Sequence, residues 1–168
     1  MKRTIIIFLI IILCFLLQTT VFQAVALADV VPNLLLVITV ATGYMRGRKE
    51  ALYTGLFCGL LLDLVYGSVI GLYALLFMVI GYLNGYCNKI YYKDDFTIPI
   101  ILVGVSDLFY NFFYYVFEFL LRSRLHLLFY VRRIMLPELV YTVLVSVVLY
   151  KLLHTLNGYL EHSEKKEV

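Results

Sequence analysis

Acidic and amide side chains inside apolar runs are the residues of this chain best suited to chemistry or recognition. Asp63 follows three leucines in an apolar run that begins at Gly59. Asp107 and Asn111 are one helical turn apart in a run rich in Phe and Tyr, so a helix would place them on one face. An ionisable group within lipid costs at least a few kcal/mol unless it is paired, hydrated or protonated. Each of these residues therefore needs a partner.

Asp63 has three interpretations. It can be a polar cap that accepts hydrogen bonds from backbone at the Gly67 turn or pairs with an arginine of the 121–133 loop, which is the interpretation we favour. It can instead bind a substrate or an ion, or contact a partner protein. Asp107 and Asn111 could likewise hold a ligand, although an interhelical hydrogen bond is the simpler role for them.

Patterns of known catalytic and metal sites are missing from the sequence. It has no GxSxG elbow, HExxH pair, phosphate-cradling loop or Cys/His cluster. Its cysteines and histidines are scattered without metal-ligand or catalytic spacing, at Cys14, Cys58, Cys87, His126, His154 and His162. We predict no enzyme activity, no metal and no cofactor. The modest net charge of +3, spread between apolar runs, also argues against a nucleic-acid partner.

The elements that must position these residues are transmembrane helices. Hydrophobic residues make up 63% of the 168 residues and charged residues only 15%, which excludes an ordinary soluble domain. A helix needs about 20 residues to cross a bilayer core of roughly 30 Å. The apolar runs predict spans at 4–27, 31–45, 51–66, 70–87, 97–120 and 134–152. We therefore predict an all-α membrane protein, a compact bundle of about six transmembrane helices that forms one domain over 1–156, with a polar cytoplasmic tail at 157–168.

Two features of the first three spans leave alternatives. The first run follows Lys2 and Arg3 and ends near a small-residue motif at Ala28, as in a secretory signal, but it is long enough to span, so we predict an uncleaved anchor. The second and third runs are shorter than a full bilayer core. Either snorkelling by Arg46 and Arg48 lets them cross, which we favour, or they form a shallow hairpin.

Prolines and Asp29 predict where helices begin. Asp29 can cap the second span and Pro32 would lie in its first turn, which places the start of that helix near Val30. Pro99 and Pro137 are placed similarly near the starts of the fifth and sixth spans. All three prolines are therefore interpreted as helix-start signals.

Basic residues predict that both termini are cytoplasmic in a multi-pass protein of the bacterial cytoplasmic membrane. With six spans, every Lys and Arg except those of the 121–133 loop falls on the cytoplasmic side. The exceptions are Arg122, Arg124, Arg132 and Arg133. These arginines could pair with Asp63, Glu118 and Glu138 in the outer half of the membrane. The alternative is a re-entrant run, which would make the loop cytoplasmic.

Glycines at GxxxG spacing predict close helix packing. The pairs are Gly43 with Gly47, Gly55 with Gly59, Gly67 with Gly71, and Gly81 with Gly85. Such pairs let helix backbones approach closely, either within the chain or against a helix of another protein. Gly67 and Gly71 lie between spans and are better explained as a tight turn.

The order and spacing of several landmarks resemble the bacterial rod shape-determining MreD family. These landmarks are the segments that begin at Pro32, Arg46 and Gly55, the Asp63-Leu pair, the Gly67 to Gly71 turn, the Gly81 to Gly85 segment, and Pro137-Glu138-Leu139. The resemblance implies a non-catalytic scaffold for rod shape and lateral peptidoglycan synthesis. Its implied partners are MreC, MreB and the pair of the RodA glycosyltransferase with its penicillin-binding transpeptidase.

The resemblance also implies a fold similar to the substrate-binding S components of energy-coupling-factor transporters. The alternative function is therefore the substrate-binding membrane component of a vitamin or small-molecule transporter. Whether the chain forms a homodimer or binds a lipid-linked precursor stays open. The candidate structural or partner-contact residues are Pro32, Gly55, Gly59, Asp63, Gly67, Gly71, Gly81, Gly85, Asp107, Asn111, Pro137 and Glu138.

Overall fold

The computed structural model describes residues 2–26, 29–91, 95–120 and 126–166. The chain is 88% helical, which confirms the predicted all-α class. The elements are α1 (Lys2–Thr19), α2 (Val21–Ala24), α3 (Leu34–Arg46), α4 (Arg48–Tyr66), α5 (Leu72–Asn84), the 3-10 helix η1 (Gly85–Ile90), α6 (Thr97–Tyr115), the π-helical turn η2 (Val116–Leu120), α7 (Leu127–Tyr130), the π-helical turn η3 (Val131–Met135) and α8 (Leu136–Lys166).

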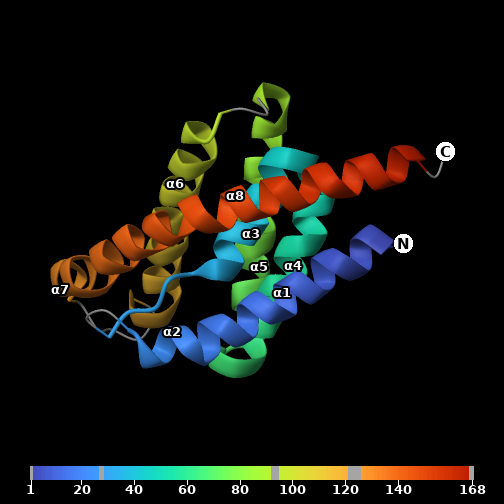
Figure 1. The fold of residues 1–168 in the computed structure, drawn as a ribbon. Coiled ribbons are helices and arrows are strands. Elements are labelled where there is room, and N and C mark those ends of the chain that lie inside the picture. The colour runs from blue at the N-terminus through green and yellow to red at the C-terminus, as the bar shows by residue number, and fades with distance from the viewer. Residues whose placement is uncertain (1, 27–28, 92–94, 121–125, 167–168) are drawn as a thin grey trace.

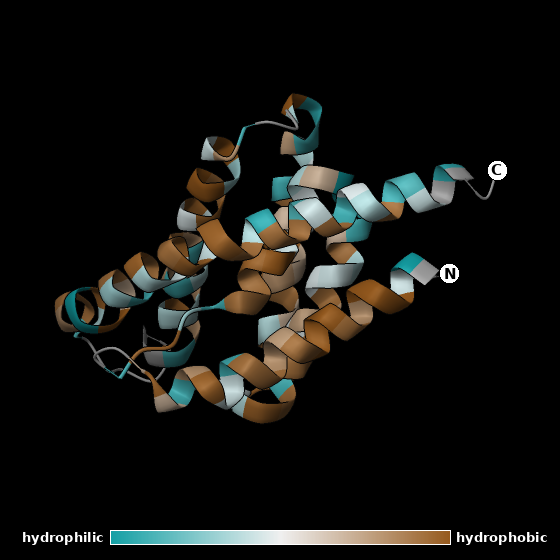
Figure 2. Ribbon diagram, in the orientation of Figure 1, coloured by the Kyte–Doolittle hydropathy of each residue, from teal (hydrophilic) through white to brown (hydrophobic). Residues whose placement is uncertain are grey.

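Helix α3 is the centre of the bundle (Figure 1). It contacts α1, α4, α5, α6 and α8, and its residues from Leu34 to Tyr44 are buried. This explains why α3 is apolar around its whole circumference, since no side of it faces a polar environment. The other helices expose apolar side chains on the outside of the bundle, and hydrophobic residues, coloured brown, predominate along α1 in Figure 2. An apolar exterior is what a bundle in lipid requires.

Helices α4 and α5 pack backbone to backbone through glycines. A Cβ on Gly81 of α5 would lie 2.5 Å from the carbonyl oxygen of Ala51 in α4, and a Cβ on Gly85 would lie 2.5 Å from Cα of Arg48. Gly55 and Gly59 of α4 meet the backbone of Phe77 and Ala74 in α5 in the same way. Both helices therefore contribute bare backbone to one interface, and these glycine pairs act within the chain.

The long helices connect two ends of the bundle. At one end, which we call the terminal end, Arg3, Arg46 and Asn157 lie close together, and both termini lie on this side (Figure 1). At the other end, which we call the opposite end, Gln23 bonds Tyr66 and Ser68 bonds Glu118. Helices α1, α3, α4, α5, α6 and α8 alternate in direction between these ends.

Three helical stretches are long and apolar enough to cross a membrane. They are Arg3–Ala24, Thr97–Glu118 and Leu127–Ser163, and Leu34–Arg46 is a shorter apolar helix. The predicted first, fifth and sixth spans correspond to the three long stretches. The membrane character of the chain is thus confirmed, whereas the number of six crossings stays a prediction.

The predicted start of the second span near Val30 is wrong. Helix α3 begins at Leu34, and its cap is Asn33, whose side-chain oxygen accepts a hydrogen bond from the Leu36 N–H at 3.1 Å. Asp29 has a φ of 64° in the preceding segment and does not cap this helix. Pro32 therefore lies before the helix and not in its first turn. Asn is as good a cap as Asp, so the sequence offered two start sites and the later one is used.

Pro137 lies near a helix start, as predicted, since it is the second residue of α8, which begins at Leu136 after the π-helical turn η3. A wider turn at this point accommodates a residue that has no N–H to donate. The polar segment that begins at Asn157, predicted as a tail, is helical as far as Lys166, where α8 ends.

Candidate functional site

Asp63, which belongs to α4, caps the N-terminus of the neighbouring helix α5. Its Oδ1 accepts a hydrogen bond from the Tyr73 N–H at 3.1 Å and its Oδ2 accepts one from the Ala74 N–H at 3.0 Å. Gly71, at the start of α5, has a φ of 102° and no side chain with which to cap. The carboxylate of Asp63 therefore substitutes for a local cap, at a helix end where negative charge is favourable.

This geometry decides between the expected partners of Asp63. Asp63 is 3% exposed, and its carboxylate bonds two N–H groups of α5 rather than the Gly67 turn or a described arginine. Gly67 instead continues the α4 backbone pattern, as its N–H bonds the Asp63 carbonyl at 3.1 Å. Arg122 and Arg124, which were expected as partners, lie outside the described residues.

Asp107 and Asn111 are buried on α6, and the half-buried Glu138 of α8 completes a polar cluster with them. Asn111 Nδ2 donates to the Asp107 carbonyl oxygen at 3.1 Å and lies 3.5 Å from Asp107 Oδ2. The Tyr130 hydroxyl of α7 donates to Asn111 Oδ1 at 3.3 Å. The Glu138 carboxyl lies close enough to that of Asp107 for the two to repel each other. The expected hydrogen bond between helices is therefore present, and it joins α6 to α7.

A pocket opens at the opposite end of the bundle, above this polar cluster. Its volume is about 540 Å³, within the range of small-molecule sites. The wall is contributed by α1, the segment before α3, α4, α5, α6 and the stretch from α7 to α8. The lining residues are Gln18, Asp29, Val30, Val31, Asn33, Leu62, Tyr66, Tyr73, Tyr110, Tyr114, Phe129, Arg133, Ile134 and Glu138.

Tyrosines form one wall of this pocket. The ring centroids of Tyr73 and Tyr114 are 5.5 Å apart, those of Tyr73 and Tyr110 are 6.1 Å apart, and those of Tyr110 and Tyr114 are 6.0 Å apart. Tyr66 and Phe129 add further rings. At these distances aromatic side chains hold each other in place, so the wall is preformed.

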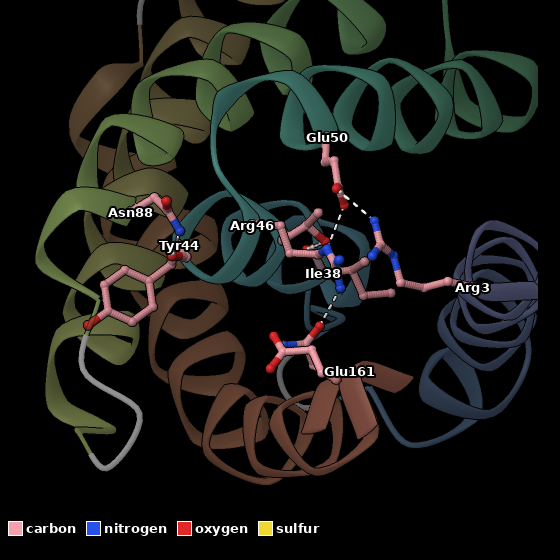
Figure 3. A network of polar contacts seen from close by, with 9 residues as sticks. Arg3, Ile38, Tyr44, Arg46, Glu50, Asn88 and Glu161 are labelled. Carbon is pink, nitrogen blue, oxygen red and sulfur yellow. Dashed lines mark hydrogen bonds and ion pairs between the residues drawn. The ribbon is translucent and has the colours of Figure 1, made fainter. Parts of the chain in front are cut away.

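The terminal end has a polar network of a different kind (Figure 3). Glu50 accepts a hydrogen bond from Arg3 at 2.8 Å, and its other oxygen lies 2.6 Å from Nε of Arg46. Arg46 also donates to Asn157 of α8 at 2.5 Å. Nearby, Asn88 of η1 donates to the Tyr44 carbonyl at 2.8 Å. The network ties α1, α3, α4 and α8 together at their polar ends.

The twelve predicted site residues lie in four places. Gly55, Gly59, Gly81 and Gly85 lie in the α4–α5 interface, while Asp63, Gly67 and Gly71 lie around the turn that joins these helices. Asp107, Asn111, Pro137 and Glu138 lie at the α6–α8 cluster, and Pro32 stands in the segment that lines the pocket between Val31 and Asn33. Whether any of them contacts a partner protein stays a prediction.

Sequence reasoning missed the tyrosine wall and the terminal network. Tyr73, Tyr110 and Tyr114 belong to two helices, and nothing in their spacing shows that they converge. Tyr110 and Tyr114 are one turn apart, the only local signal that they share a face. For Arg46 and Glu50 the i,i+4 spacing was a usable signal, whereas Arg3 and Asn157 join them only through the fold.

The described residues offer little for metal-dependent chemistry. Within the part of the chain that the structure describes, no group of three or more His, Cys, Asp or Glu side chains could hold a metal ion. Cys14 and Cys58 are buried free thiols in the hydrophobic core. What the arrangement provides is a preformed aromatic pocket with carboxyl groups beside it.

Fold and site together define an all-helical integral membrane protein with a cavity of ligand size at one end of the bundle. Residues 2–159 match the family model described as rod shape-determining protein MreD. The chain belongs to the MreD family, as the sequence landmarks indicated, and this places it in the determination of rod shape. No curated protein and no solved structure matches it, so a likeness to transporter S components stays a prediction.

Proposed function

We propose that this protein is a non-catalytic membrane scaffold of the bacterial elongation complex, which supports lateral peptidoglycan synthesis by binding MreC. Further proposed partners are MreB and the pair of RodA and its penicillin-binding protein. The family match over residues 2–159 carries this proposal. Membership of the family associates the chain with the rod-shape complex in general, and the absence of catalytic motifs from the sequence agrees with a binding role.

The apolar exterior supports lateral binding of partner helices. Large apolar side chains such as Leu64, Leu128 and Val148 are more than two thirds exposed on the outside of the bundle. The glycine interfaces are already occupied within the chain, so they leave partner docking to these outer faces. Transmembrane helices associate through van der Waals packing and interhelical hydrogen bonds.

A second candidate function is the substrate-binding component of a small-molecule transporter, and the pocket is the observation that favours it. Its volume of about 540 Å³ and its preformed wall suit a small ligand. No comparable observation on the described residues supports movement of such a ligand across the membrane. The two functions differ in what accompanies the purified protein, because a scaffold retains wall-synthesis proteins and a transporter component retains its substrate.

Purification after mild crosslinking tests the scaffold directly. In cells that depend on this chain for rod shape, the tagged protein is expected to restore rods and to co-purify MreC in near-equal amount. The matched control is an unrelated multi-pass protein with the same tag at the same abundance. Restored rods without MreC would contradict the partner assignment, and failure to restore rods at normal abundance would contradict the scaffold role.

We further propose that six helices cross the membrane and that both termini are cytoplasmic. Helices α1, α3, α4, α5, α6 and α8 alternate between two ends, and the termini share one of them. Reporter fusions at Val168 and in the 121–133 loop are expected to report opposite sides. A fusion near Gly47 should agree with Val168, and one near Gly71 with the loop. If Val168 and the loop report the same compartment, the six-span arrangement is wrong.

A further inference from the structure

The pocket at the opposite end combines aromatic rings with carboxyl groups. Tyr73, Tyr110 and Tyr114 form the aromatic wall, and Glu138 lines the same pocket. Aromatic rings present a negative face to whatever lies over them. The wall and the carboxyl therefore favour the same kind of occupant, one that carries positive charge.

Among the residues that the structure describes, neither Glu138 nor Asp107 forms a salt bridge. The salt bridges recorded there join Glu50 to Arg3 and Arg46, at the other end of the bundle. Behind Glu138 lies Asp107, which is 0% exposed, and its Oδ1 has no hydrogen-bond partner in the part of the chain that the structure describes. Two neighbouring carboxyls cannot both stay ionised in a low-dielectric site without compensation. They need either protons or a cation.

The size and lining of the pocket indicate which cation would fit. A volume of about 540 Å³ far exceeds that of a bare metal ion, and the described residues contain no metal-binding cluster. Aromatic walls with a carboxylate are the recognised environment of ammonium and quaternary ammonium groups. Arg133 also lines the pocket, with its guanidinium 5.7 Å from the centre of the Phe129 ring. A ligand that carries an anionic group as well as an ammonium group could contact both the guanidinium and the carboxylate.

We infer that this pocket binds an organic ammonium group, held between the tyrosine wall and Glu138. The group belongs either to a free amine or to an ethanolamine-type lipid headgroup, which share this chemistry. The inference goes beyond the scaffold function and does not depend on it.

The test uses full-length protein in a detergent without amines, titrated calorimetrically with choline and with ethanolamine. Each has a neutral counterpart of similar shape, 3,3-dimethylbutan-1-ol for choline and propan-1-ol for ethanolamine. At least one of the two ammonium compounds is expected to bind about tenfold or more tightly than its counterpart, since cation–π attraction and a carboxylate act on charge alone. If neither exceeds its neutral counterpart, the inference is overturned.

Variants locate the binding within the pocket. Glu138→Gln is expected to weaken ammonium binding about tenfold, whereas the matched Glu161→Gln at the terminal end should leave it unchanged. Tyr114→Phe keeps the ring and should retain binding within about twofold, while Tyr114→Leu should lose about fivefold or more. The Tyr114 pair keeps the test valid if Glu138→Gln fails to fold. Equal effects of Phe and Leu at Tyr114, with folding intact, would contradict the aromatic contact.

Nanodiscs separate the two sources of the ammonium group. In discs of phosphatidylglycerol alone, choline should bind as in detergent. If added phosphatidylethanolamine weakens the apparent choline affinity, the lipid headgroup occupies the pocket, and if it does not, the site serves a soluble amine. Both results support an ammonium site. Because the readout is binding to purified protein, a negative result would leave the rod-shape and co-purification experiments unaffected.

Discussion

Replacing Asp63 with leucine is expected to destabilise the protein by about 1–3 kcal/mol for each of the two backbone donors that lose their acceptor. The Tyr73 and Ala74 N–H groups would stay buried without a partner, because Asp63 is 3% exposed and water has no access. Asp63→Asn should fall between wild type and leucine. Its amide oxygen can accept one of the two bonds, and its NH₂ group would face the second donor.

Thermal unfolding in detergent, followed by size exclusion, measures the order of stability of wild type, Asp63→Asn and Asp63→Leu. The matched control is Asp95, whose Oδ1 accepts a hydrogen bond from the Thr97 N–H at 2.9 Å at the exposed start of α6. Asp95→Leu should cost less, about 0.5–2 kcal/mol, since water can replace the lost acceptor. If asparagine and leucine at position 63 are equally damaging at normal membrane abundance, the negative charge itself is required and a role as a simple cap is wrong.

A side chain at Gly59 is expected to separate α4 from α5. A Cβ there would lie 2.5 Å from the Tyr73 carbonyl oxygen and 2.6 Å from the Ala74 N atom, which are backbone atoms and cannot rotate away. Gly59→Ala should therefore cost about 1–3 kcal/mol, and Gly59→Leu more, with loss of folded protein. The opposing gain in helix propensity is only about 1 kcal/mol.

Gly158 in α8 provides the matched control, because a Cβ there meets no atom within 4 Å. Gly158→Ala and Gly158→Leu should leave unfolding unchanged or raise stability slightly. Unfolding in mixed micelles of mild detergent and dodecyl sulphate gives the comparison. Wild-type stability of Gly59→Leu would remove the argument that α4 and α5 pack through bare backbone.

Apolar runs were sufficient to predict the helices, because lipid-facing and buried positions are both apolar and only helix ends need polar residues. The errors arose at those ends. Asp29 and Asn33 are both good caps, and only the fold decides that Asn33 is used. At the other end of the chain, the predicted span stops at 152 and a polar tail follows from 157, whereas a helix can continue beyond its apolar part, as α8 does to Lys166.

The polar residues of the site were found from sequence, and their partners were not. Asp63, Asp107 and Asn111 were conspicuous because charge or amide groups are rare in apolar runs. The partners of Asp63 are backbone groups of another helix, which every residue has and no sequence pattern reveals. The pocket could not be predicted from sequence for a similar reason, since its wall joins Tyr73 of α5 to Tyr110 and Tyr114 of α6.

The length of α8 sets how the C-terminal end meets other molecules. Its 31 residues make a rod of about 46 Å at 1.5 Å per residue, against a bilayer core of roughly 30 Å. An upright α8 would therefore extend about 16 Å beyond the hydrocarbon. A protein that engages this end meets a rigid, charged helix at a fixed height above the lipid, and its reach must match that height.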